Sequence, residues 1–152
     1  MHVLPEDRAN SELANGFVLG TSPTYCAIQI LNEAGGWMVL IDLFESDYVP
    51  RMRGNPNRLM VLLLDFDNDI NRLEYVQSRV PLDLADRVFV IGVLTEPEDL
   101  RKHFGPHYEA IGYGLAEDCR SATSLVWGHV LLQHNSAELA RLNHQVRPIL
   151  FP

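Results

Sequence analysis

Residues 59–67 read Leu-Met-Val-Leu-Leu-Leu-Asp-Phe-Asp, an apolar run that ends in two carboxylates. A turn-forming segment, Gly54-Asn-Pro-Asn57, precedes the run. The length and composition of the run are typical of a strand that is buried on both faces of a parallel sheet. In open α/β sheets, ligands bind at the carboxyl edge of the strands. Asp65 and Asp67 are therefore expected at such an edge, where a cation or a proton must compensate their charge.

Strand and helix patterns alternate along the rest of the chain. Strands are expected at 2–4, 25–31, 59–64 and 87–94, and helices at 7–17, 37–48, 69–80, from 95 onward, 108–119, 123–133 and 136–146. This alternation indicates right-handed crossovers and a three-layer α/β fold with a mainly parallel four-stranded sheet. The order 2-1-3-4 would place the first and third strands side by side. We expect one domain over 1–152, with a core over about 1–120 and a C-terminal helical extension over about 121–152.

Composition narrows the class of protein. The chain has 152 residues, of which 47% are hydrophobic and 21% charged, as is usual for a soluble globular protein. No apolar stretch reaches the roughly 18–20 residues that span a bilayer. The first residues lack the pattern of a signal peptide, and the two cysteines, Cys26 and Cys119, lack metal-site spacing. These features predict a cytoplasmic protein with reduced thiols and no membrane partner.

The acidic residues follow the ends of the predicted strands. Glu6 follows the first strand, Asp65 and Asp67 follow the third, and Glu98 follows the fourth. Carboxylate oxygens are natural ligands for Mg²⁺ or Mn²⁺, and such ions activate water and stabilise charge on a phosphodiester. The net charge of −8 argues against a general nucleic-acid coat, which needs a basic face. It is compatible with a metal-dependent enzyme, because cations neutralise carboxylate ligands.

Three of these features resemble a Toprim domain, in particular that of the OLD (overcoming lysogenization defect) nucleases. They are Glu6 after the first strand, the strand that ends in Asp65-Phe66-Asp67, and the acidic helix start in Leu94-Thr-Glu-Pro-Glu-Asp-Leu100. The resemblance implies that Glu6, Asp65 and Asp67 are catalytic, that they bind Mg²⁺ or Mn²⁺, and that Glu98 is a further ligand. It also implies a nuclease or phosphoryl-transfer activity on nucleic acid, and a separate ATPase as partner.

One departure from the family favours a different class of function. Toprim domains have Glu-Gly after the first strand, whereas this chain has Glu6-Asp7. Together with the negative net charge, this departure favours a non-catalytic module that regulates a complex or binds a partner, which would be another protein such as an ATPase or a second copy of the chain. The apolar residues 149–151 and the C-terminal helices would supply its interface, and the segment 147–152 is expected as an edge strand or a docking segment. A small-molecule phosphohydrolase or a receiver-like phosphoacceptor that uses the same acidic edge ranks third, since a receiver would need a lysine at the end of the strand at 87–94 and none is there.

Helix capping is the alternative explanation for several of the acids. Asp67 or Asn68 would cap the helix at 69–80, and Thr95 with Glu98 has the spacing of a capping box. The candidate caps of the first helix are Asp7, Asn10 and Ser11. Under this interpretation the carboxylates serve the helices and not a metal.

The one concentrated basic stretch flanks the strand that leads to Asp65. It contains Arg51, Arg53 and Arg58. These arginines are candidates for contacts with the phosphates of a substrate, and a solvated loop is the alternative.

Overall fold

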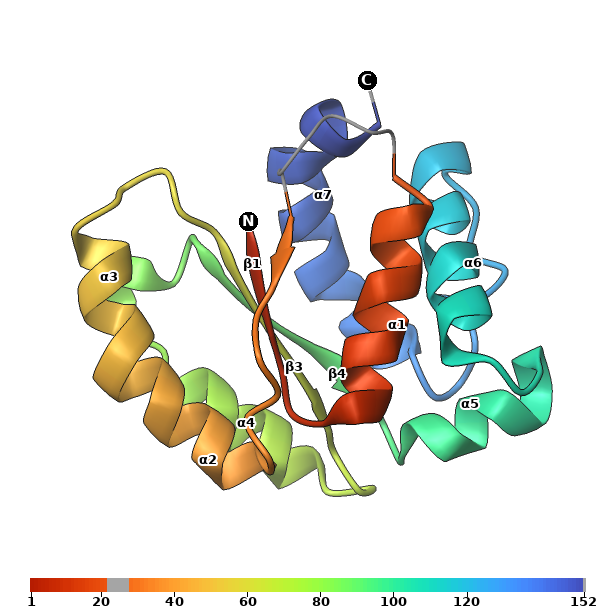
Figure 1. Ribbon diagram of the computed structural model, residues 1–152, viewed down its shortest axis with the longest axis horizontal. Coiled ribbons are helices and arrows are strands. Elements are labelled where there is room, and N and C mark those ends of the chain that lie inside the picture. The colour runs from red at the N-terminus through yellow and green to blue at the C-terminus, as the bar shows by residue number, and fades with distance from the viewer. Residues whose placement is uncertain (22–27, 152) are drawn as a thin grey trace.

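The computed structural model describes residues 1–21 and 28–151 and has an α/β architecture (Figure 1). Its sheet has four parallel strands in the order β2-β1-β3-β4. The strands are β1 (His2–Pro5), β2 (Gln29–Ile30), β3 (Met60–Asp65) and β4 (Val88–Val93). The predicted fold class and strand order are confirmed.

Helices cover both faces of the sheet. On one face lie α2 (Trp37–Leu43), α3 (Val49–Arg53) and α4 (Ile70–Ser78), with a π-helical turn at Phe44–Tyr48 between the first two. On the other lie α1 (Arg8–Leu19), α6 (Tyr108–Ser121) and α7 (Ser136–Leu150), and α5 (Pro97–Phe104) lies beside α6. Short 3-10 turns occupy Leu82–Leu84 and Gln133–Asn135. None of the helices in the described parts of the chain is long and apolar enough to cross a bilayer.

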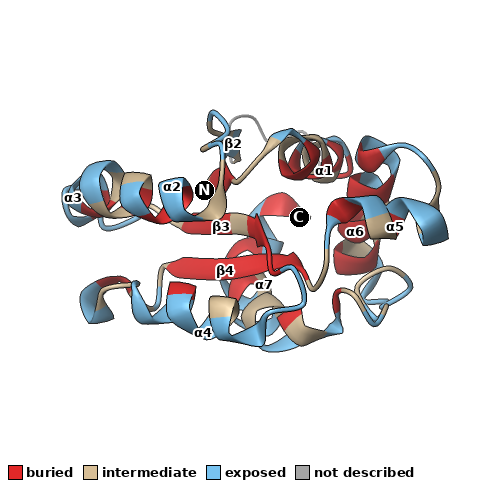
Figure 2. Ribbon diagram, turned by 90° about the horizontal axis from the view of Figure 1, so that it is seen from below, coloured by how far each residue is buried: buried red, intermediate tan, exposed pale blue. Residues whose placement is uncertain are grey.

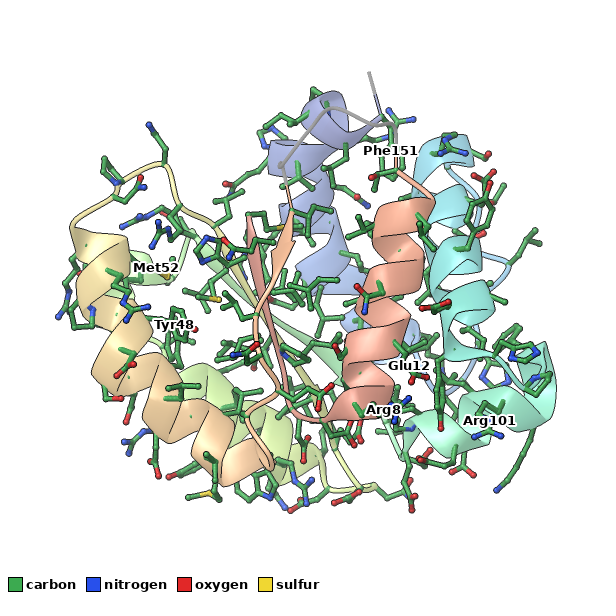
Figure 3. The ribbon with its side chains drawn as sticks, in the orientation of Figure 1. Arg8, Glu12, Tyr48, Met52, Arg101 and Phe151 are labelled. Atoms are coloured by element: carbon green, nitrogen blue, oxygen red, sulfur yellow. The ribbon has the colours of Figure 1, made fainter. Side chains whose placement is uncertain are left out.

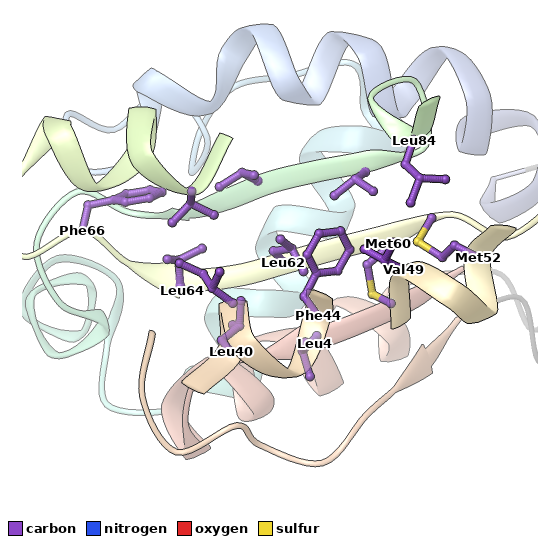
Figure 4. Close-up of a cluster of buried hydrophobic side chains, with 14 residues drawn as sticks. Leu4, Leu40, Phe44, Val49, Met52, Met60, Leu62, Leu64, Phe66 and Leu84 are labelled. Carbon is purple, nitrogen blue, oxygen red and sulfur yellow. The ribbon is translucent and has the colours of Figure 1, made fainter. Parts of the chain in front are cut away.

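Alternate residues of the strands supply the two cores. Leu62 and Leu64 of β3 pack with Phe44 and Met52 in the core under α2, α3 and α4 (Figure 4). Val61 faces the other way, into the core that α1 and α7 cover. β4 is buried along its whole length (Figure 2). Burial on both faces is why the central strands read as continuous apolar runs and not as alternating ones.

α1 and α6 cross at glycines. A Cβ atom on Gly16 would lie 2.0 Å from the carbonyl oxygen of Glu109, and one on Gly112 would lie 2.0 Å from that of Leu13. Both distances are far below van der Waals contact, so the two backbones touch only because these positions have no side chain. This crossing holds α1 and α6 in direct backbone contact.

Among the described residues, side chains and not another strand close the outer edge of β4. The amide of Asn135 accepts a hydrogen bond from Gly92 N–H (3.1 Å) and donates one to Gly92 C=O (2.8 Å). Two residues along, Val90 N–H donates to the carboxylate of Glu138 (3.2 Å). These contacts satisfy ladder groups that an edge strand would otherwise leave open to pairing with another chain.

Replacing Asn135 with Ala is expected to lower the free energy of unfolding by about 3 kcal/mol, because it leaves a buried N–H and a buried C=O of Gly92 without partners. Urea unfolding followed by circular dichroism measures the loss. Asn15→Ala, at an exposed position of α1, is the control and should change stability by less than about 1 kcal/mol. Equal small effects of the two substitutions would contradict the role of Asn135.

The predicted helix at 123–133 is wrong. The chain forms turns there, because the buried carboxylate of Asp118 accepts hydrogen bonds from the N–H groups of Leu125 (2.9 Å), Val126 (2.7 Å) and Trp127 (3.0 Å). Burial alone would raise the pKa of Asp118, but these bonds and one from Thr123 outweigh it and lower the pKa. A carboxylate from α6 thus takes the donors that a helix would have used.

Two further predictions concern the C-terminal segment and the strand expected at 25–31. The segment 147–151 is not an edge strand, because α7 continues to Leu150, whose buried side chain anchors the last turn in the core. Of the strand expected at 25–31, Gln29 and Ile30 form β2, whereas 25–27 lie outside the described residues. Cys26 lies there too, and Cys119 is a buried free thiol.

Candidate functional site

Glu6 and Asp65 meet at the carboxyl edge of the sheet. Glu6 follows β1 and Asp65 ends β3, and the N–H of Glu6 donates to Leu63 C=O (2.8 Å). The N–H of Asp65 in turn donates to Oε2 of Glu6 (2.9 Å). The predicted adjacency of these two acids is therefore present, at the end of the molecule where α1 begins; Arg8 and Glu12 mark that helix start in Figure 3.

The side chain of Asp65 is buried against α1. It is 8% exposed, and its Oδ1 accepts a hydrogen bond from Nδ2 of Asn10 (3.1 Å), which is itself fully buried. Nδ2 of Asn10 also donates to Oδ1 of Asp7 (3.1 Å), the N-cap residue of α1. The same oxygen of Asp7 accepts a hydrogen bond from the backbone N–H of Asn10 (3.0 Å). The capping interpretation is thus correct for Asp7, and Asn10 joins this cap to Asp65.

The carboxyl groups at this edge are buried close to one another, and this shifts their pKa values. Burial raises the pKa of Asp65 to about 8; the hydrogen bond from Asn10 opposes the rise, and the charges of Glu6, Asp7 and Asp67 add to it. Burial also raises the pKa of Glu6, against the hydrogen bond from Asp65 N–H. A carboxyl at a strand edge with a pKa raised as far as that of Asp65 is a candidate for a functional site.

Asp67 lies in an unusual turn directly after β3. Asp67 and Asn68 both have positive φ angles, 47° and 59°, a backbone conformation that is uncommon outside glycine. Their N–H groups donate to the carbonyls of Thr95 (3.2 Å) and Leu94 (2.8 Å). The cap of α4 is Asp69, whose carboxylate accepts from Asn71 N–H (3.0 Å), so the prediction that Asp67 or Asn68 caps this helix is wrong.

The carboxylate of Asp67 forms an ion pair with Arg72, a residue that the sequence analysis did not predict at the site. Nη1 of Arg72 lies 2.7 Å from Oδ2 of Asp67 and donates to the carbonyl of Asp65 (2.9 Å). The guanidinium stacks over the ring of Trp37, 4.8 Å from its centroid. A cation in the first turn of a helix interacts unfavourably with the helix dipole. The position of Arg72 in the first turn of α4 was therefore the one sign in the sequence that this arginine has a specific partner.

The donor set fits a hard divalent cation in its chemistry, because all three side chains are carboxylates, but they are not arranged as a coordination shell. Among the described residues, no group of three or more His, Cys, Asp or Glu side chains is arranged to hold a metal ion. The carboxylate of Glu6 accepts from the backbone N–H of Asp65, and its charge adds to the rise in the pKa of the buried Asp65 carboxyl, so the two acids are neighbours. Carboxylate oxygens of this kind are the ligands that hard divalent cations prefer. The third carboxylate, that of Asp67, is paired with Arg72.

Glu98 is not brought to this group. The N-cap of α5 is Glu96 and Pro97 follows it, so the predicted capping box of Thr95 and Glu98 does not form. The carboxylate of Glu98 interacts instead with the hydroxyl of Tyr108, and the interactions that shift the pKa of Asp65 do not include it. Its proposed part as a metal ligand has no support from this geometry.

The three arginines lie at the other end of the sheet. Arg58 precedes the first residue of β3, and the strand spans about 17 Å at the usual rise of about 3.3 Å per residue. Arg53 pairs with Asp83 (2.8 Å), and Arg51 lies 3.9 Å from Asp47. Tyr48 and Met52, labelled in Figure 3, mark this region. The structure does not bring these arginines to the acidic edge.

Comparisons of the chain with protein-family models, with curated proteins and with solved structures find no match. The resemblance of Glu6 and Asp65-Phe66-Asp67 to a Toprim domain therefore stays a prediction. The side chains at the acidic edge are the basis for a functional conclusion.

Proposed function

We propose that the chain is a Toprim-like enzyme that uses Mg²⁺ or Mn²⁺ for phosphoryl transfer on nucleic-acid phosphodiesters. The observation that carries the proposal is the buried carboxyl of Asp65 beside Glu6, with the pKa of Asp65 raised to about 8. Removing a carboxylate from water is costly, and a bound cation offsets that cost.

The three acids share one part in this proposal, and Glu6 has a second. Glu6, Asp65 and Asp67 hold the cation, which when bound polarises the phosphoryl oxygens and lowers the pKa of bound water. Burial raises the pKa of Glu6, and a carboxyl with a raised pKa is a candidate general acid or base. A separate ATPase partner belongs to the same proposal, because it follows from the resemblance to OLD-type domains.

Asp65→Asn and Asp67→Asn are expected to weaken Mg²⁺ or Mn²⁺ binding more than about tenfold and to abolish cation-dependent cleavage of DNA and RNA. Isothermal titration calorimetry and a gel assay on single- and double-stranded substrates measure the two effects. Asp69→Asn is the matched control, because it removes a carboxylate from the same loop and leaves a residue that also caps helices. A wild-type protein that shows no heat of binding at millimolar Mg²⁺ or Mn²⁺ would refute the proposal.

A non-catalytic module that binds a partner is the second candidate. The ion pair of Arg72 with Asp67 favours it, because this pair neutralises one carboxylate without any metal. Cation binding without cleavage of any nucleic acid would support this second candidate. Light scattering after size-exclusion chromatography tests self-assembly, and a strict monomer at high concentration would argue against a second copy as the partner.

A further inference from the structure

Arg72 forms an ion pair with Asp67 at the acidic edge. Its side chain is 12% exposed, whereas that of Asp67 is 53% exposed, and the two meet at 2.7 Å. The charge of Arg72 also lowers the pKa of Glu6, although burial, the larger effect, raises it. Arg72 therefore acts electrostatically on two of the acids proposed to bind the cation.

The guanidinium is anchored independently of Asp67. Nη1 donates to the backbone carbonyl of Asp65 (2.9 Å), and the guanidinium stacks on Trp37. An arginine that loses its carboxylate partner would still be held here by these two contacts. It would stay at the acidic edge and would not swing into solvent.

The hydrogen-bonding capacity of Arg72 is not fully used. A guanidinium has five N–H donors. Among the described residues, Nε of Arg72 is buried and has no hydrogen-bond partner. Buried polar groups nearly always have partners, and one without a partner calls for an explanation. A planar donor fork of this kind matches the oxygens of a phosphate.

We infer that Arg72 is an internal counter-ion of Asp67, which a divalent cation displaces, and that the released guanidinium then binds a phosphate of the substrate. The inference rests on the proposed function and adds a phosphate-binding residue to it. A cation and a guanidinium compete for the same carboxylate because each is stabilised by its charge. In the exchange Asp67 turns to the cation, and Arg72 moves from a carboxylate oxygen to a phosphate oxygen.

Arg72→Met tests the competition, because Met keeps an unbranched apolar side chain that can pack on Trp37 and has no charge. We expect Mg²⁺ and Mn²⁺ to bind Arg72→Met at least about tenfold more tightly than wild type, because the competing cation is gone. Inorganic phosphate, titrated into the cation-loaded protein, should bind wild type and should lose at least about tenfold in affinity for Arg72→Met. Arg72→Lys keeps the charge and is the control, with cation affinity close to that of wild type.

A second measurement uses the unaltered protein, so that it does not depend on how the variant folds. The side-chain Nε–H signal of Arg72, in ¹⁵N-arginine-labelled protein and assigned by its absence in Arg72→Lys, should shift on addition of Mg²⁺ and again on addition of inorganic phosphate. Mg²⁺ binding without either shift would overturn the inference.

The outcomes separate this inference from the proposed function. Cation binding by wild type with no tighter binding by Arg72→Met overturns the inference alone. Cation binding by neither protein overturns the proposed function and the inference with it. Tighter cation binding together with loss of phosphate binding supports both.

Discussion

Asp65→Asn is expected to raise the free energy of unfolding at pH 8 by about 3 kcal/mol, although the same substitution should remove cation binding. The buried carboxyl of Asp65 is costly to ionise, and the charges of Glu6, Asp7 and Asp67 add to that cost. Asparagine keeps an oxygen that can accept the hydrogen bond from Asn10 and has no charge to bury. This acid would thus be kept for function at the expense of stability.

The pH dependence follows from the direction of the shift. In the unfolded chain an Asp carboxyl ionises near pH 3.8, and in the folded protein the pKa of Asp65 is about 8. Between these values the folded protein holds a proton that the unfolded chain has lost, so unfolding becomes easier as pH rises. The stabilisation is fully present below about pH 4 and is lost as pH rises through about 8. The raised pKa of Glu6 acts in the same direction.

Urea unfolding of both proteins at pH 5 and pH 8 measures this effect. Wild type should lose stability over this range, Asp65→Asn should lose much less, and Asp69→Asn should follow wild type. Millimolar Mg²⁺ at pH 8 should restore stability to wild type and not to Asp65→Asn, because a ligand stabilises only the folded state that binds it. Parallel pH profiles of wild type and Asp65→Asn would contradict the burial of an uncompensated acid.

Gly112→Ala is expected to destabilise the protein by about 3 kcal/mol, because a methyl group there would lie 2.0 Å from the backbone oxygen of Leu13. A backbone atom cannot move aside as a side chain can, so α1 and α6 would have to separate. Since α1 carries Asp7 and Asn10, the same change should also weaken cation binding.

Gly114→Ala is the matched control for this substitution, two residues along the same helix. Its new methyl group would meet only a methyl of Val126, at 3.2 Å, and a side chain can adjust. Alanine favours a helix over glycine by about 1 kcal/mol, so this variant should be as stable as wild type or slightly more stable. Equal urea midpoints for Gly112→Ala and Gly114→Ala would contradict the close crossing of α1 and α6.

Much of the fold could be predicted because its signals are local. The apolar runs at 59–64 and 87–94 identified β3 and β4, and the alternation of strands and helices indicated a parallel sheet in the order that is observed. The meeting of Glu6 and Asp65 followed from that order, since the ends of neighbouring parallel strands share an edge.

The errors lie where a distant group overrides a local pattern. The segment 123–133 has helical periodicity, yet Asp118 from α6 captures its N–H groups. Glu98 follows a strand end in the sequence, but in the structure its carboxylate interacts with Tyr108. The arginines at 51, 53 and 58 precede β3, and the length of that strand separates them from the acids at its other end.

The sequence by itself determined the sheet, its order and the edge at which Glu6 and Asp65 meet, because hydrophobic runs and parallel connections leave few other arrangements. Only the tertiary structure decided the state of the acids at that edge. Burial against α1 raises the pKa of Asp65, and Arg72 on α4 takes Asp67 as its partner. Desolvation and ion pairing depend on distances between elements far apart in the chain, and no local pattern records those distances.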